Sequence, residues 1–212
     1  MKHRLWWLVG LIVGILGVIL LTRPPAKPRA AQSLVLAADA EGGAPYIFKN
    51  PDNPQENIGF EVDLAAALAR QLGRPVEFKQ YEFSSLISGL ERGDFDMAMN
   101  GLEITPDRQA RVRFSRPYYV YRLQFVVRAG ETRFRSLAEC QGRKDVVIGT
   151  LEDTAAARLL DQLGLNKKIY PGQVEPYADL ALRRIDGVLL DLPIALYCAR
   201  DNPALEFAGD SI

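Results

Sequence analysis

Residues 59–73 read GFEVDLAAALARQLG and form one of the most regular segments of the chain. Large apolar side chains recur in this segment at helical spacing, at Phe60, Leu64, Leu68 and Leu72. With Gly73 as a stop signal, the segment predicts an amphipathic helix that packs one face on a core. Strand-like runs flank it at residues 34–38 (LVLAA) and 76–81 (VEFKQY). A strand, a helix and a strand in this order are typical of α/β architecture.

Outward from this unit, predicted strands and helices continue to alternate. Residues 105–107 (TPD) combine an N-cap residue, a proline at the first helical position and an acid in the first turn, so they predict a helix start. The other predicted elements are a helix at 84–92, strands at 95–99, 118–128 and 146–149, a helix at 154–163 and a strand at 187–191. Two such series joined by one long strand predict two lobes with a cleft between them, lobe one at 32–127 and lobe two at 128–212.

The formal net charge of zero hides two unlike parts. Residues 1–31 carry five basic side chains and no acid, so residues 32–212 have a net charge of −5. Because nucleic-acid binding needs a basic face, we expect no nucleic-acid partner. The single histidine, His3, excludes a Ser-His-Asp triad and an HExxH zinc helix from the rest of the chain. Cys140 and Cys198 either pair outside the cytoplasm or remain two buried thiols.

The N-terminus is typical of a membrane segment. Residues 5–21 are apolar, follow a basic start and would span about 25 Å as a helix, near the lower limit for a bilayer core. No good small-x-small cleavage site follows them. We interpret residues 1–31 as an uncleaved transmembrane anchor or a cleaved signal helix, followed by a proline-rich spacer. The domain is then periplasmic or extracellular, either attached to the cytoplasmic membrane or secreted.

A few charged residues could bind a small polar ligand. Arg108 lies one turn into the helix that begins at Thr105, where its guanidinium could hold a carboxylate in two parallel hydrogen bonds or be solvated. Asp191 ends an apolar strand, where it could accept an ammonium group or cap the next helix. Asp153 and Thr154 open another helix and could offer N–H groups to an anion or act only as caps.

Further acids and aromatic residues lie near predicted strand ends and loops. The acids are Asp39, Glu41 and Glu103, and the aromatic residues are Tyr46, Tyr81 and Phe83. Each acid belongs either to a pocket or to the solvated surface. Each aromatic residue either walls a pocket or packs in a core.

Several spaced motifs occur in an order that resembles one family. They are GFEVDLAAALA at 59–69, GLEITPDR at 101–108, VRFSRPYY at 112–119, GR at 142–143, VIGTLEDTA at 147–155 and RIDGVLLD at 184–191. The likeness covers about residues 33–209 and resembles the bacterial extracellular solute-binding proteins of family 3, the polar amino-acid-binding components of ABC transporters. It implies a periplasmic-binding-protein-like fold of type II, a Venus flytrap that closes on a free L-amino acid and delivers it to ABC permease subunits.

The resemblance also implies how the two charges of the amino acid are held. Arg108 looks like the arginine that grips the α-carboxylate, and Asp191 like the aspartate that accepts the α-ammonium group. Asp153, Thr154 and Ala155 match a turn whose N–H groups meet the carboxylate from lobe two.

Other positions of the implied site concern the ligand's surroundings. Asn100 and Gly101 match a strand end whose backbone faces the ligand, and Phe83 matches the wall under the ligand side chain. Asp39, Glu103 and Tyr46 complete the predicted site. We expect no metal, no cofactor and no catalytic residue.

Two positions depart from the family pattern. Glu103 stands where many relatives carry a small hydroxyl residue, and Gly43 stands where an aromatic residue often stacks on the ligand. We expect Glu103 either to help Asp191 hold the ammonium group or, with Asp39 or Glu41 nearby, to meet a cationic side chain. The expected ligand is therefore a basic or polar amino acid.

The order of lobes in the family sets a further expectation. Its chains return from lobe two to finish lobe one with a last strand and helices, whereas this chain reaches Ile212 about where the return should begin. We expect lobe one to lack this return segment, as in a fragment of a binding-protein and permease fusion or in a truncated product. Two other functions stay open, an exported cyclohexadienyl dehydratase-like enzyme using Glu103 as the acid, and the sensing domain of a membrane receptor.

Overall fold

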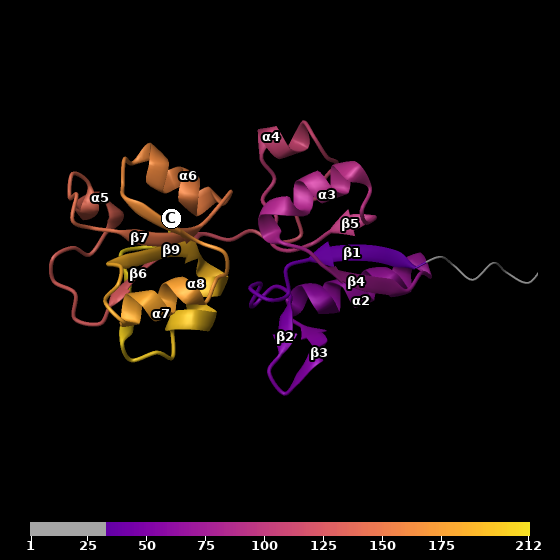
Figure 1. Cartoon of the computed structure of the whole chain (residues 1–212), viewed down its shortest axis with the longest axis horizontal. Helices are drawn as coiled ribbons and strands as arrows, with labels where there is room; N and C mark the ends of the chain where they lie inside the picture. The colour runs from indigo at the N-terminus through magenta and orange to yellow at the C-terminus, as the bar shows by residue number, and fades with distance from the viewer. Residues whose placement is uncertain (1–32) are drawn as a thin grey trace, which may run out of the picture. The chain divides into compact units, whose positions relative to one another are not determined.

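The computed structural model describes residues 33–212, so the predicted anchor or signal helix and its spacer at 1–31 lie outside the described residues. Two sheets form the two lobes, one with the strand order β4-β1-β5 and one with the order β10-β6-β9-β7-β8 (Figure 1). Within residues 33–212, no helix is both long and apolar enough to cross a membrane. The predicted two-lobed α/β fold is confirmed.

Lobe one is built on three parallel strands, β1 (Leu34–Ala38), β4 (Val76–Gln80) and β5 (Met97–Ala98). β1 is central, and its alternating side chains supply two small cores. Leu36 and Ala38 pack with α2 (Phe60–Leu72). On the other face, Ala37 packs with Leu86 of α3 (Leu86–Arg92), which follows the short η1 (Phe83–Ser85) (Figure 1).

Helix α2 lies where the sequence predicts it, but its buried face differs. Gly73 ends the helix in the left-handed conformation, with φ at 62°. The buried residues are Glu61 and Ala65, whereas Leu72 is 50 % exposed. The buried face of α2 therefore includes an acid, Glu61, which accepts hydrogen bonds from the Gly101 N–H and the Tyr118 hydroxyl.

A two-stranded antiparallel hairpin, β2 (Phe48–Asn50) and β3 (Asn53–Ile58), precedes α2. The sequence of β3, NPQENI, is polar and mostly exposed. It has neither an apolar run nor a clean alternation of apolar and polar residues, so hydrophobic pattern could not predict this hairpin.

Lobe two is a mixed five-stranded sheet in which β6 runs antiparallel to both of its neighbours and the remaining pairs are parallel. Its strands are β10 (Leu205–Ala208), β6 (Leu123–Arg128), β9 (Gly187–Asp191), β7 (Ile148–Leu151) and β8 (Lys167–Tyr170). All residues of β7 and β9 are buried. Strands buried on both faces need helices on both sides.

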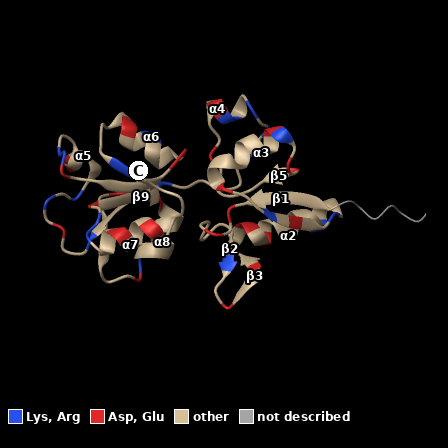
Figure 2. Ribbon diagram, in the orientation of Figure 1, with Lys and Arg blue, Asp and Glu red and all other residues tan. Residues whose placement is uncertain are grey.

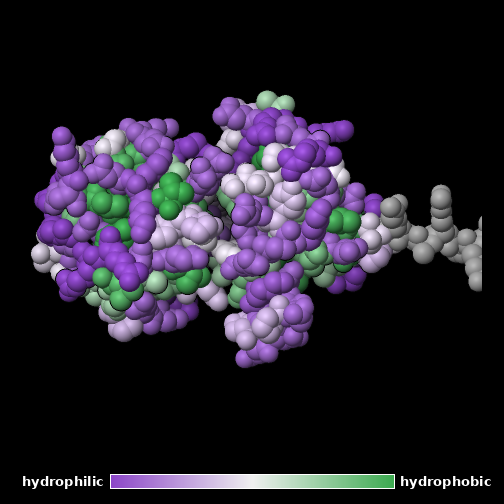
Figure 3. Space-filling view, viewed as in Figure 1, coloured by the Kyte–Doolittle hydropathy of each residue, from purple (hydrophilic) through white to green (hydrophobic). Residues whose placement is uncertain are grey.

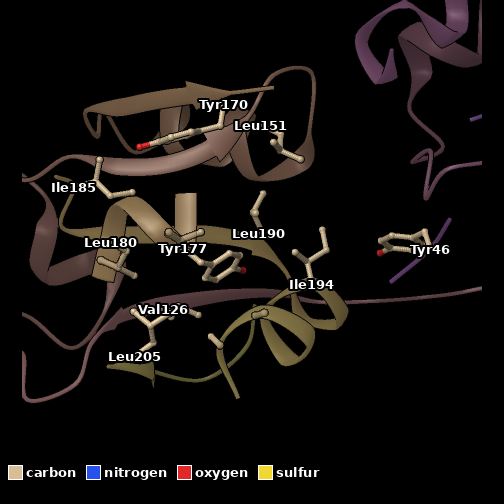
Figure 4. Close-up of a cluster of buried hydrophobic side chains, with 13 residues drawn as sticks. Tyr46, Val126, Leu151, Tyr170, Tyr177, Leu180, Ile185, Leu190, Ile194 and Leu205 are labelled. Atoms are coloured by element: carbon tan, nitrogen blue, oxygen red, sulfur yellow. The ribbon is translucent and has the colours of Figure 1, made fainter. Parts of the chain in front are cut away.

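Helices cover both faces of this sheet (Figure 1). α5 (Leu137–Cys140) and α6 (Ala155–Gln162) pack on one face around Leu160 and Leu189. α7 (Glu175–Ala181) and α8 (Leu192–Ala199) pack on the other, in the cluster that Figure 4 shows. On the visible surface, hydrophobic side chains reach solvent only in separate patches between hydrophilic ones (Figure 3).

The long strand predicted at 118–128 is shorter and lies elsewhere than expected. Tyr118, Tyr119 and Val120 are largely exposed and belong to no strand. The strand β6 begins at Leu123 and pairs with β9 and β10, so residues 123–127 lie in the lobe-two sheet and not in lobe one. Because five of the six residues of β6 are buried, the strand requires a position inside a sheet covered on both faces.

Both cysteines are free thiols. Cys140 is buried in the core on the α5 and α6 side, whereas Cys198 packs against the core on the α7 and α8 side. The sheet separates them, so the disulfide alternative is wrong for this structure.

Candidate functional site

Arg108 is positioned by a short helix, α4 (Pro106–Gln109). Thr105 caps this helix, because its hydroxyl accepts a hydrogen bond from the Arg108 N–H at 3.3 Å. Arg108 is only 8 % exposed, so the alternative of a solvated surface arginine is wrong. A buried guanidinium needs hydrogen-bond partners for its donors.

The guanidinium of Arg108 finds these partners in both lobes. Nη1 donates to the Glu103 carboxylate at 2.5 Å and to the Glu103 carbonyl at 3.2 Å. Nη2 donates to the Asp153 carbonyl of lobe two at 2.8 Å. The guanidinium carbon also lies 5.9 Å from the ring centroid of Phe83, within the range of a cation–π contact. Arg108 therefore ties the loop before α4 to the turn before α6.

Glu103 also reaches lobe two. Its Oε1 accepts a hydrogen bond from the backbone N–H of Ala155 at 2.8 Å, at the N-terminus of α6. Thr154 caps the same helix end by accepting from the Ala157 N–H at 3.1 Å. One carboxylate thus lies between a guanidinium and a helix N-terminus, both of which favour negative charge.

Asp191 lies at the end of β9, and its carboxylate is 8 % exposed. Its side chain makes no capping hydrogen bond to α8, so the capping alternative is wrong. Instead, its Oδ2 accepts a hydrogen bond from the hydroxyl of Tyr46 at 2.9 Å. Burial raises the pKa of Asp191 to about 7; the Tyr46 hydrogen bond opposes this shift and the charge of Glu103 adds to it.

Tyr46 brings lobe one against this acid. Its side chain is 2 % exposed, its ring packs 5.1 Å from that of Phe60, and it joins the buried cluster of lobe two. Figure 4 shows it approaching that cluster on the side of Ile194. Burial, first, and the neighbouring Asp191 carboxylate raise the pKa of Tyr46, so the phenol remains a hydrogen-bond donor.

The strand end at Asn100 and Gly101 is held by hydrogen bonds to Asp39 and Glu61. Oδ1 of Asn100 accepts from the Asp39 N–H at 2.6 Å. The Gly101 N–H donates to Oε1 of Glu61 at 2.9 Å, and the Tyr118 hydroxyl donates to the same oxygen. Glu61 is fully buried, which raises its pKa. The sequence pattern gives Glu61 no distinct role, because an acid in the first turn of a helix is common at exposed positions.

Tyr121 is a second residue that sequence reasoning missed. Burial, the charge of Asp191 and the charge of Glu103 together raise its pKa. It lines a pocket of about 440 Å³ with Tyr46, Glu103 and Ala155. The pocket is therefore lined by Glu103, which binds Arg108, and by Tyr46, which binds Asp191.

Asp39 is not in contact with either group. Its carboxylate accepts hydrogen bonds from Gln80 at 2.9 Å and from the Phe83 N–H at 3.4 Å. It lines a second pocket of about 550 Å³, which also contains the aromatic rings of Phe83 and Tyr170. The acids lining this pocket are Asp39, Glu41, Glu82, Glu152 and Glu175, and none of the described lining residues is Lys or Arg. Figure 2 shows acidic residues in red on helix α7, the helix that carries Glu175.

Two lobes that meet at a buried guanidinium, a helix N-terminus and a buried acid are typical of a solute-binding protein. The chain matches the family model of the bacterial extracellular solute-binding proteins, family 3, over residues 34–207, and it belongs to this family.

Relatives and solved structures agree with this assignment. The chain is 30 % identical over 167 residues to the Escherichia coli (strain K12) "Putative ABC transporter arginine-binding protein 2", covering 78 % of this chain and 67 % of the relative. A Salmonella typhimurium periplasmic binding protein, whose structure is described as a basis for high arginine specificity, superposes with a TM-score of 0.76 at 28 % identity, covering 86 % and 79 % of the two chains. An ancestral amino acid-binding protein described as a precursor of cyclohexadienyl dehydratase gives a TM-score of 0.76 at 26 % identity, covering 84 % of this chain and 80 % of that chain.

Proposed function

We propose that this protein binds a free L-amino acid with a cationic side chain on the outer side of the cytoplasmic membrane, for import by an ABC permease. The observation that carries this proposal is that Arg108 and the Ala155 N–H already hold a carboxylate between the lobes, that of Glu103. A site that fits one carboxylate in this way has the donors required by the α-carboxylate of an amino acid.

The opposite charge of the amino acid would meet Asp191. An ammonium group that leaves water needs an ionised partner and hydrogen-bond acceptors. Asp191 provides both at the end of β9, and Tyr46 orients its carboxylate from lobe one. A ligand held by Arg108 in lobe one and Asp191 in lobe two would favour the arrangement in which the lobes are in contact.

The acidic pocket supports a cationic side chain. Its five carboxylates would attract a guanidinium or ammonium group, and the ring of Phe83 offers a surface on which such a group could stack. The Escherichia coli relative and the Salmonella typhimurium structure are both named for arginine. We therefore propose arginine as the first ligand to test.

The transport role rests on the family and on the predicted N-terminal segment. Residues 5–21 would anchor the protein, or direct its secretion, and the spacer would hold the domain away from the membrane. The partners would be ABC permease subunits.

One structural neighbour favours an enzymatic alternative, because it is described as a precursor of cyclohexadienyl dehydratase. Such an enzyme needs an acid that protonates a leaving hydroxyl. Glu103 is an unfavourable candidate, since both of its carboxylate oxygens accept hydrogen bonds, from Arg108 and from Ala155. Product formation from prephenate or arogenate would decide for this alternative.

The test is a thermal-shift screen of the protein against the twenty amino acids, followed by calorimetry. We expect arginine to give the largest stabilisation and Arg108→Ala to bind it more weakly, because the ligand carboxylate would then lie beside Glu103 without a cationic partner. Arg111→Ala is the control, since Arg111 pairs with Glu91 on the surface. A screen in which no amino acid stabilises the protein would contradict the proposed function.

A further inference from the structure

The donors that the proposed function assigns to the ligand carboxylate are the donors that Glu103 uses. Nη1 of Arg108 lies 2.5 Å from Oε2 of Glu103, and the Ala155 nitrogen lies 2.8 Å from Oε1. Nη1 also donates to the Glu103 carbonyl, and Nη2 donates to the Asp153 carbonyl. A ligand carboxylate cannot take the same positions while Glu103 holds them.

We propose that Glu103 is an internal competitor for the carboxylate subsite, which an amino acid must displace from Arg108 and Ala155 in order to bind. This inference rests on the proposed function. The sequence led us to expect that Glu103 would bind either the ammonium group or a cationic side chain of the ligand. In the structure its carboxylate instead pairs with Arg108 of the protein.

Burial makes this competition strong. The side chains of Arg108 and Glu103 are 10 % and 12 % exposed, so water screens their attraction only weakly. Charge-assisted hydrogen bonds of this kind are about twice as strong as neutral ones. An entering carboxylate replaces one such set of bonds by an equivalent set, so its own contacts contribute little net affinity.

The ammonium end of the ligand does not meet this competition. Asp191 accepts its hydrogen bond from Tyr46, and no basic side chain pairs with it among the described residues. The nearby negative charge of Glu103 disfavours ionisation of Asp191 and, after burial, contributes to its raised pKa. The cationic groups of the ligand should therefore supply most of the binding affinity. The ligand carboxylate should add little affinity, although Arg108 and Ala155 both offer it donors.

An internal competitor at the carboxylate subsite predicts an unusual ligand selectivity. Agmatine has the guanidinium and amine of arginine but lacks the carboxylate, so it leaves the Glu103 contacts intact. The wild-type protein should therefore distinguish arginine from agmatine only weakly. Removing the charge of Glu103 should free Arg108 and Ala155 for the ligand carboxylate and increase the distinction.

The experiment measures the Kd values of L-arginine and agmatine by calorimetry for the full-length wild-type protein, Glu103→Gln and Glu103→Ala. We expect Glu103→Gln to bind arginine about tenfold more tightly than wild type, since its amide keeps the shape of Glu103 but loses the charge-assisted bonds. Agmatine affinity should not improve. Glu103→Ala should change arginine binding in the same direction, and thermal unfolding reports whether each variant is folded.

Glu91→Gln is the matched control, because it removes the same charge and breaks another Glu–Arg pair of lobe one, that with Arg111, at the surface. It should leave both Kd values unchanged. If both Glu103 variants fold and bind arginine no more tightly than wild type, Glu103 is not a competitor, while binding by the wild type leaves the proposed function intact. If wild type and variants bind no amino acid, the proposed function fails and this inference fails with it.

Discussion

The hydroxyl of Tyr46 donates a hydrogen bond of 2.9 Å to the carboxylate of Asp191, across 145 positions of the chain and from one lobe to the other. Both residues are buried. Asp191 therefore belongs to lobe two, but its pKa is influenced by Tyr46 of lobe one. Any change at Tyr46 should be visible as a change in the protonation of Asp191.

Replacing Tyr46 with phenylalanine should raise the pKa of Asp191 above its value of about 7. The Tyr46 hydroxyl stabilises the ionised carboxylate, whereas burial and the charge of Glu103 destabilise it. Because only the ionised form pairs with an ammonium group, the affinity for the amino acid should fall as the pH drops through this pKa. In Tyr46→Phe, the midpoint of a plot of affinity against pH should move upward.

Tyr197→Phe provides the control for this titration. Tyr197 is 50 % exposed and packs its ring against Phe48, with ring centroids 5.4 Å apart. The midpoint should be the same in this variant as in wild type. An unchanged or lower midpoint in Tyr46→Phe would show that the hydrogen bond does not stabilise the charge of Asp191.

The raised pKa of Asp191 also predicts how stability depends on pH. Between about pH 4 and pH 7, the folded protein keeps a proton on Asp191 that the unfolded chain has lost, so the contribution of this group to stability decreases as the pH rises. Above pH 7 the folded state contains a buried carboxylate. Asp191→Asn should therefore be more stable than wild type at pH 8, by on the order of 2–4 kcal/mol, and nearly equal at pH 4.

Denaturant unfolding at several pH values measures this difference. Asp179→Asn should behave in the opposite way, because hydrogen bonds from Lys168, Tyr170 and Arg184 lower the pKa of Asp179. Its contribution is present at neutral pH and disappears as the pH falls through the lowered pKa. A stability difference between wild type and Asp191→Asn that does not vary with pH would contradict the assignment of the raised pKa.

The sequence predicted the two-lobed α/β fold, and it placed Arg108 in a helix start and Asp191 at a strand end, because these features depend on local pattern. Arg108 follows an N-cap, a proline and an acid, and Asp191 ends an apolar strand that is followed by a helix. These signals lie within a few residues of each position and do not depend on which distant segment packs against it. The hairpin at residues 48–58 has no such pattern and was missed.

Contacts between distant segments could not be predicted in this way. Glu61 and Tyr121 become site residues only because the fold places Gly101, Tyr118 or Asp191 beside them. For Glu103, the sequence showed the departure from the family but not the partners, since Ala155 belongs to lobe two and meets Glu103 only when the two lobes are in contact. The pairing of acids and bases across a fold is a property of the tertiary structure.

Both cysteines should behave as protected thiols. Burial raises the pKa of Cys140 to about 11 and that of Cys198 to about 12, and thiols react through their ionised form. In the native protein at pH 8, both should react slowly with a disulfide reagent, and in denaturant both should react fully without prior reduction. An unfolding temperature that drops on addition of a reducing agent would indicate a disulfide instead.

Gly101→Ala should weaken both the fold and ligand binding. Gly101 has φ at 64°, a left-handed conformation that costs a residue with a Cβ about 1–2 kcal/mol. The new Cβ would also lie 3.0 Å from the ring of Tyr46, closer than ordinary contact. Since Tyr46 is buried on both sides and holds Asp191, displacing its ring should lengthen that hydrogen bond and reduce the affinity for the amino acid.

Gly93→Ala separates the two effects of this substitution. Gly93 also has a positive φ, 76°, but a Cβ there meets nothing within 4 Å. Both variants should lose stability in denaturant unfolding, but Gly101→Ala should lose about 1–3 kcal/mol more, the usual cost of overpacking a buried site. Only Gly101→Ala should bind the amino acid more weakly in calorimetry. Equal losses of stability and affinity in the two variants would mean that the Tyr46 ring moves away freely. The position of this ring beside Gly101 would then not determine the hydrogen bond to Asp191.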